Sequence, residues 1–148
     1  MRSRIYRIIC PVCGQAFTSN TKLEFEMQVL RKFHEHVVVE HRDWINSWYN
    51  ENRKNFRYVK RECLKPFKNS LPIGYWLNGR AIFAEAPLNI VDKIRRASSY
   101  YELDEALEQI ERSNAFFATK LQARILREWL VSYVLKKEAK ITVEMGRG

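Results

Sequence analysis

C-P-V-C-G-Q-A-F, at residues 10–17, and F-H-E-H-V-V-V-E-H, at residues 33–41, begin and end the segment that decides how this chain folds. Its two cysteines are separated by two residues, and the glycine that follows them allows a tight turn with both sulfurs facing one ion. A helical pattern separates this turn from the histidines. Cysteines on a turn and histidines on a helix predict a tetrahedral Zn²⁺ site. The predicted ligands are Cys10, Cys13, His36 and His41.

The order of these residues resembles the Cys2His2 zinc finger over about residues 5–42. Phe17 occupies the position of the phenylalanine in the family pattern, three residues after the second cysteine. The resemblance implies a ββα unit whose helix packs on Phe17. In one respect the sequence departs from the family pattern, because Glu26 occupies the position of the first histidine and the histidines come ten residues later. Ten residues are close to three helical turns. We therefore predict a finger with a lengthened helix, in which Phe33 packs against Phe17.

The spacing of the histidines makes further demands on the helix. His36 and His41 lie about 140° apart around an ideal helix, so we expect its last turn to tighten or bend. His34 is about 10 Å from His41 along the axis, too far to share an ion with it. Glu40 makes the segment similar to a metalloprotease motif, but four protein ligands leave no open position for catalysis. We expect a structural site and no enzyme, and we assign no role to Cys63. A reduced Cys-x-x-Cys turn beside surface histidines is the alternative.

Composition limits the class of protein. The 148 residues are 46% hydrophobic and 13% aromatic, which favours an ordered fold over disorder. Three cysteines, two of them in one turn, fit a reducing compartment better than a disulfide framework. No run of about 18 apolar residues is present, so we expect no membrane span. We predict an intracellular protein.

Positive charge is concentrated in the middle of the chain. The net charge is +9, and residues 51–100 hold 11 of the 26 Lys and Arg residues against 4 of the 17 Asp and Glu residues. A basic segment interleaved with aromatic residues is either a solvated linker or helix face, or a surface whose cations bind phosphates while its rings stack on bases. We favour the second interpretation. The predicted nucleic-acid-binding residues are Arg31, Lys32, Arg53, Lys54, Arg57, Lys60, Arg61, Lys65 and Lys68.

The remaining patterns predict an α+β fold that is mostly α. Residues 4–9 and 15–18 favour two short strands before the long helix, whose N-cap is Thr21 and whose apolar period runs through Leu23, Met27, Leu30, Phe33 and Val37. Asn78-Gly79 predicts a β-hairpin with a type I′ turn. Three helices follow, near residues 88–97, from a Ser99 cap, and near 115–137, and the segment 141–144 favours a final strand. We expect three parts: residues 1–50, 51–72 and 73–148.

The last predicted helix carries a wide apolar stripe. The stripe comprises Phe117, Leu121, Ile125, Leu126, Trp129, Leu130, Tyr133 and Val134. We expect it to form the core of the C-terminal part, and a homodimer through residues 115–137 is the alternative.

Together these features predict a zinc-stabilised nucleic-acid-binding protein, on DNA rather than RNA, that acts as a transcription regulator. Its basic, aromatic-rich composition also resembles that of small proteins encoded by archaeal viruses. The alternative is a protein-interaction module, for example a viral factor that binds a host protein, with a purely structural zinc site. In that case Trp44, Trp48 and Trp76 would form the interface, and the acidic segment 102–111 would meet a basic partner.

Overall fold

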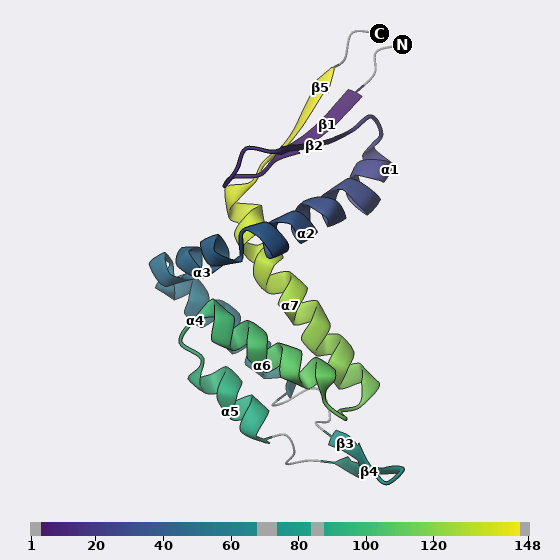
Figure 1. Cartoon of the computed structure of the whole chain (residues 1–148), viewed down its shortest axis with the longest axis vertical. Helices are drawn as coiled ribbons and strands as arrows, with labels where there is room; N and C mark the ends of the chain where they lie inside the picture. Colours follow the sequence, from purple (N-terminus) through teal and green to yellow (C-terminus); the bar gives the residue numbers. More distant parts are fainter. Residues whose placement is uncertain (1–3, 68–73, 84–87, 146–148) are drawn as a thin grey trace. The chain divides into compact units, whose positions relative to one another are not determined.

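A computed structural model of the protein describes residues 4–67, 74–83 and 88–145, and it has the predicted α+β, mostly helical architecture (Figure 1). The first half contains β1 (Arg4–Ile9), β2 (Ala16–Ser19), α1 (Lys22–Glu24), the π-helical segment η1 (Phe25–Val29), α2 (Leu30–Glu40), α3 (Arg42–Glu51) and α4 (Arg53–Lys65). The second half contains β3 (Gly74–Leu77), β4 (Arg80–Phe83), α5 (Leu88–Arg96), α6 (Tyr100–Arg112), α7 (Phe117–Glu138) and β5 (Ile141–Met145).

The chain divides into two compact units. The terminal unit lies within residues 1–45 and 131–148, and the central unit within residues 46–130. Each unit has its own sheet. In the terminal unit the strand order is β2-β1-β5, and in the central unit β3 pairs with β4. The terminal unit therefore joins segments from the two ends of the chain.

Both strand pairs of the terminal unit are antiparallel. β1 pairs with β2 through the hairpin predicted from the sequence, with Ile8 opposite Phe17. The predicted final strand also forms, and β5 adds to the other side of β1 with Tyr6 opposite Val143 and Ile8 opposite Ile141. The two ends of the chain are thereby held in one sheet (Figure 1).

The first helix is continuous over 19 residues, from α1 through η1 to α2, and it begins at its predicted cap, because the backbone N–H of Glu24 donates to the Thr21 hydroxyl over 3.2 Å. The predicted apolar period of this helix is wrong at its start. Leu23 and Met27 are 68% and 65% exposed, whereas Phe25 and Val29 are buried, with the Phe25 ring 5.9 Å from that of Tyr6.

The π-helical segment explains which side of this helix is buried. The buried residues recur every four positions, which is more than the 3.6 residues of one α-helical turn. A π-helical turn contains more residues than an α-helical one, so η1 keeps the row in line along the sheet. The row comprises Phe25, Val29, Phe33 and Val37.

The central unit contains the predicted hairpin and caps. Asn78 and Gly79 have φ angles of 49° and 77°, as the type I′ turn requires. The hydroxyl of Ser99 accepts from the backbone N–H of Glu102 and caps α6. α4, α6 and α7 supply most of the buried side chains of this unit, among them Phe56, Val59, Cys63, Leu103, Leu107, Ile110, Leu126 and Leu130.

The apolar stripe predicted for the last helix is wrong at its N-terminal end. Phe117, Leu121 and Ile125 are exposed on α7. Three residues of the predicted stripe, Leu126, Leu130 and Val134, are buried. The other buried positions of this helix are Thr119, Ala123, Val131 and Leu135. A 22-residue helix has room for two apolar rows, and the sequence alone does not say which one meets the core.

Candidate metal centre and basic helix surface

The turn between β1 and β2 brings the two cysteines together. Gly14 has a φ of 78° and donates its backbone N–H to the carbonyl of Cys10 over 2.9 Å, and Cys10 donates to Gln15 over the same distance. A left-handed φ favours glycine at this position, as the sequence predicted for a tight turn. The thiol of Cys10 is buried and that of Cys13 is exposed.

The two histidines face the same point because α2 ends between them. His36 lies on α2, whereas His41 follows the end of the helix with φ −131° and ψ 31°. Its backbone N–H still donates to Val37 over 2.9 Å, so the chain leaves the helix only at this residue. With this change of backbone conformation at His41, the predicted bend, the two rings meet with their Nε2 atoms 3.2 Å apart.

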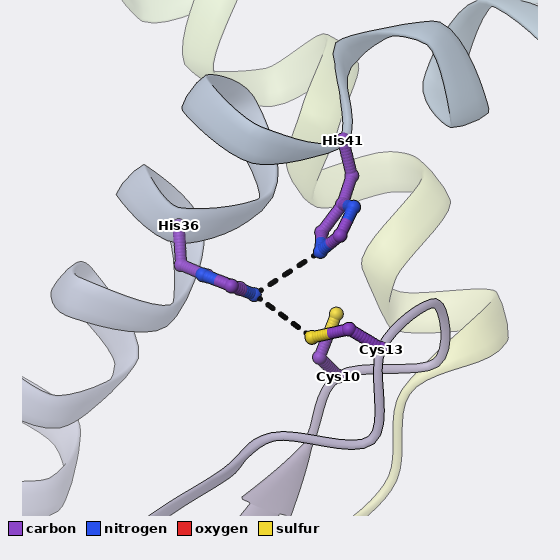
Figure 2. Close-up of side chains that lie close together, drawn as sticks. All are labelled: Cys10, Cys13, His36 and His41. Atoms are coloured by element: carbon purple, nitrogen blue, oxygen red, sulfur yellow. Dashed lines mark hydrogen bonds between the residues drawn. The ribbon is translucent and has the colours of Figure 1, made fainter.

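The four predicted ligands form one cluster (Figure 2). One ligand atom from each side chain lies within 4.8 Å of the others. Nε2 of His36 is 3.3 Å from Sγ of Cys13 and 3.2 Å from Nε2 of His41. Two sulfurs and two ring nitrogens at these distances could hold a metal ion. No other group of three or more His, Cys, Asp or Glu side chains with this property occurs within the described part of the chain.

Packing around the cluster follows the prediction for a lengthened helix. The ring of Phe17 lies 5.5 Å from that of Phe33 and 5.3 Å from that of His36. Phe33 therefore packs where the sequence places it, and the aromatic contact orients the His36 ring. His34 and Glu40 are not members of the cluster.

The third cysteine is separate from the cluster. Cys63 is buried on α4, and this burial, with a contribution from Glu62, raises the pKa of its thiol well above the ordinary value. A buried thiol that remains protonated is a weak nucleophile and a poor metal ligand. Cys63 behaves as a small apolar side chain in the core of the central unit.

Most of the predicted nucleic-acid-binding residues lie on α4, but they do not share one role. Arg53 donates to the carbonyl of Ser98 over 2.9 Å, and Lys60 donates to that of Ala97 over 2.9 Å. These carbonyls follow the end of α5, so both cations hold this helix end in place. Burial, followed by the charge of Arg53, lowers the pKa of Lys60 despite the opposing effect of Glu102.

Three cations of α4 are exposed and have no ion pair or hydrogen bond within the residues that the structure describes. They are Lys54, Arg57 and Arg61, and we call them the α4 stripe. Lys65 lies farther along the helix and pairs with Glu62 over 2.8 Å. No sequence signal separated these positions from Arg53 and Lys60, because their roles depend on where α5 ends.

The prediction that rings of this segment stack on bases is wrong for two of them. Phe56 and Phe67 are buried in the core of the central unit. Tyr58 is exposed, but its ring lies edge-on to that of Trp129, 6.2 Å away. The aromatic residues of α4 mainly fix the helix to its neighbours, and the surface they leave is cationic.

The other predicted surface residues are distributed over the chain. Arg31 and Lys32 are exposed on α2 in the terminal unit, and Lys68 lies outside the described residues. Of the tryptophans predicted to form a protein interface, Trp48 is buried. Trp76, on β3, is exposed, and its ring lies beside that of Phe116.

None of the helices in the described ranges combines the length and the apolar character that crossing a membrane requires. Comparisons with protein-family models, with curated proteins and with solved structures found no match for this chain.

Proposed function

We propose that this protein is a zinc-stabilised DNA-binding protein, in which zinc closes the terminal unit and the α4 stripe contacts the phosphate backbone of a duplex. The observation that carries the proposal is the stripe itself, three exposed cations in one row that have no partner among the described residues. In the rest of α4, Arg53, Lys60 and Lys65 already have partners. Cations that are not used internally are available for an external anion.

Zinc fits the cluster of the terminal unit. A tetrahedral zinc ion with Zn–S distances of about 2.3 Å and Zn–N distances of about 2.0–2.1 Å holds its ligand atoms roughly 3.3–3.8 Å apart. The Cys13–His36 and His36–His41 distances of 3.3 and 3.2 Å agree with this spacing. Thiolate and imidazole are the ligands that zinc prefers in structural sites.

The role of zinc would be structural. Four protein side chains complete a tetrahedral ion, and a catalytic zinc needs one position for water or substrate. The ion would join the β1–β2 turn to the end of α2, and it would add to the contacts that Phe17 of β2 makes with Phe33 and His36. Zinc binding would therefore supply much of the folding free energy of this unit.

The α4 stripe has dimensions that suit a row of phosphates. From Lys54 to Arg61 the helix rises about 10 Å, and the three side chains lie within about 60° of one another around its axis. Each strand of B-DNA places one phosphate every 3.4 Å or so along the duplex axis. Three cations over this length can neutralise about three phosphates of one strand.

Duplex DNA is a better match than a single strand. Proteins that bind single strands without sequence preference combine cations with exposed rings on which bases stack. Phe56 and Phe67 are buried, and the exposed Tyr58 beside the α4 stripe already packs edge-on against Trp129, so these rings are engaged within the protein. Contacts to phosphates position a protein on a duplex without reading its sequence. A regulator built in this way would take most of its affinity from charge.

Fluorescence anisotropy with a random duplex of about 30 base pairs, across a salt series, tests the proposal. The zinc-loaded protein is compared with a variant in which Lys54, Arg57 and Arg61 are all changed to Gln. We expect the variant to bind at least about tenfold more weakly, and its log–log salt slope to be smaller by about 3, because each lost phosphate contact removes roughly 0.9.

A matched variant controls for net charge. It removes the same number of exposed cations elsewhere, by changing Arg4, Arg96 and Lys136 to Gln. We expect this control to bind with nearly the original affinity. Equal losses in the two variants would show that only net charge matters, and the absence of binding at low salt would overturn the DNA-binding proposal altogether.

A further inference from the structure

The outer strand of the terminal sheet presents an open edge. β5 pairs with β1 on one side, and no strand of the described residues pairs with its other side. In an antiparallel sheet, alternate residues of such a strand turn their N–H and C=O groups away from the neighbour. β5 therefore offers unpaired backbone groups along its five residues.

The side chains of β5 make this edge unusual. Ile141, Val143 and Met145 are 53%, 53% and 54% exposed. They lie on one face of the sheet, since Ile141 is opposite Ile8 and Val143 is opposite Tyr6. On β1 the same face is covered, because Ile8 is buried and the Tyr6 ring contacts Phe25 of η1. The apolar face thus continues beyond the part of the sheet that the helix covers.

The usual protection of an exposed edge is missing from β5. In natural proteins, lysine, proline, a bulge or a very short length usually prevents an edge strand from pairing with another chain. β5 contains no lysine or proline, and its one charge, Glu144, is paired with Arg7 of β1 over 3.1 Å. The opposite edge strand, β2, differs, because Phe17 is packed against Phe33. An open apolar edge of this kind suits pairing with another strand.

We propose that two copies of this chain associate through β5, which pairs antiparallel with β5 of the second copy about a twofold axis at Val143. The two three-stranded sheets would then form one continuous sheet of six strands. An isologous contact closes on itself, so neither β5 remains free to recruit a third copy. This inference is independent of the proposed function, because it uses no residue of the metal cluster or of the α4 stripe.

Two observations fix the register. The apolar residues occupy alternate positions, so only a pairing centred on a residue keeps them on one face. Centring on Val143 places it opposite its own copy, and places Ile141 opposite Met145 of the second copy. Charge complementarity supports the same register. Lys140, exposed directly before β5 and without an ion pair in the described ranges, comes diagonally beside Glu144 of the second copy.

Sedimentation velocity measures the association directly. Because a five-residue edge gives a small interface, we expect a Kd on the order of 10 µM. At higher concentrations the zinc-replete protein should sediment at twice the chain mass of 17.7 kDa. The variant Val143→Lys places two like charges opposite each other, and we expect its Kd to rise by at least about tenfold.

The matched control adds the same charge at an exposed apolar position of the terminal unit outside β5. Leu23→Lys on α1 changes no residue of the proposed contact, so we expect it to dimerise as well as the unmodified protein. The variant Leu121→Glu tests the competing surface on α7, where Leu121 is exposed. Dissociation of this variant, with Val143→Lys still dimeric, would overturn the proposal, as would a monomeric unmodified protein throughout the range.

Hydrogen exchange supplies a readout that does not depend on any variant folding. In the dimer, those β5 amides that point away from β1 gain partners, so their protection should increase with protein concentration. Protection that is independent of concentration would contradict pairing through β5.

Discussion

The terminal unit and the central unit differ in the apolar core that each contains. The central unit has a core shared by several helices, with aromatic and aliphatic side chains from α4 and α6 fully buried. The terminal unit buries fewer side chains: the row on its first helix, Ile8 and Cys10, Ile45, and the C-terminal end of α7. Two of its sheet's three strands leave large apolar side chains exposed, Ile9 on β1 and Val143 on β5 among them. A unit of this size buries a smaller fraction of its surface than a larger domain does, so packing alone gives it a small margin of stability. We therefore expect a metal ion bound at the cluster to add to the stability of this unit.

Ionic contacts differ in the same way. In the central unit Arg127 donates to the buried carboxylate of Asp104 over 2.9 Å and to Glu111 over 2.6 Å. Burial disfavours the charge of Arg127, but these bonds outweigh it and raise the pKa of the guanidinium above its usual range. In the terminal unit Arg7 pairs with Glu144 and Lys22 pairs with Glu26, and both pairs are largely exposed. Exposed pairs contribute little to stability, so we expect metal binding at the cluster to matter more in this unit.

The largest effect should come from losing a metal ligand. We expect Cys10→Ser, or removal of metal by a chelator, to abolish the fold of the terminal unit while the central unit persists, because structural zinc contributes roughly 10 kcal/mol or more in zinc-finger peptides. Amide hydrogen exchange resolved by residue measures both units in one sample. The control, Cys63→Ala, removes an equally buried thiol outside the cluster and should leave one zinc per chain. Persistent protection of α2 without metal would contradict the comparison.

A smaller effect should come from the buried ion pair of the central unit. Asp104→Asn leaves Arg127 with less compensation for its burial, and we expect a loss of ~3 kcal/mol in the free energy of unfolding, measured in urea. The matched change Asp92→Asn affects the exposed pair with Arg95 and should cost less than about 0.5 kcal/mol. Zinc content should stay the same in both variants. Similar losses in the free energy of unfolding for the two variants would mean that the burial of Asp104 does not increase the contribution of its ion pair to stability.

The smallest effects should come from the two helix caps, which have the same chemistry in different units. Thr21→Ala and Ser99→Ala each remove a hydroxyl that accepts a backbone N–H over 3.2 Å, and each should cost about 1 kcal/mol. In hydrogen exchange, the first should weaken protection only in the terminal unit and the second only in the central unit. Ser47→Ala, at an exposed position of α3, should change neither. Loss of protection in both units from one cap would show that they unfold as one.

Local signals in the sequence were sufficient for much of this fold. The Cys-x-x-Cys-Gly turn, the positive φ angles at Asn78 and Gly79, and the caps at Thr21 and Ser99 each depend on a few neighbouring residues. The two cysteines and the two histidines are likewise placed by local features, and the two pairs meet in one cluster because β2 packs on the helix through Phe17 and Phe33. The spacing of the histidines even required the bend that the backbone makes at His41. Interactions confined to one turn or one helix end can be predicted without knowledge of the fold.

Tertiary structure decided which faces are buried. Leu23 and Met27 fit the period of an α-helix, but contact with the sheet and a π-helical turn bury Phe25 and Val29 in their place. Packing also decided the position of Phe56. Its place among basic residues predicted an exposed ring, but the ring is buried in the helical core.

The sequence by itself determined the turn and the caps, because each arises from backbone preferences and side chains close along the chain, and its motif identified the ligand set. Only the tertiary structure decided that β5 joins β1, that Arg53 and Lys60 bind the end of α5, and that three cations remain exposed on α4. These outcomes depend on contacts between segments far apart in the sequence. Apolar surface can be buried in several arrangements of nearly equal local energy, and only packing of the whole unit selects one of them.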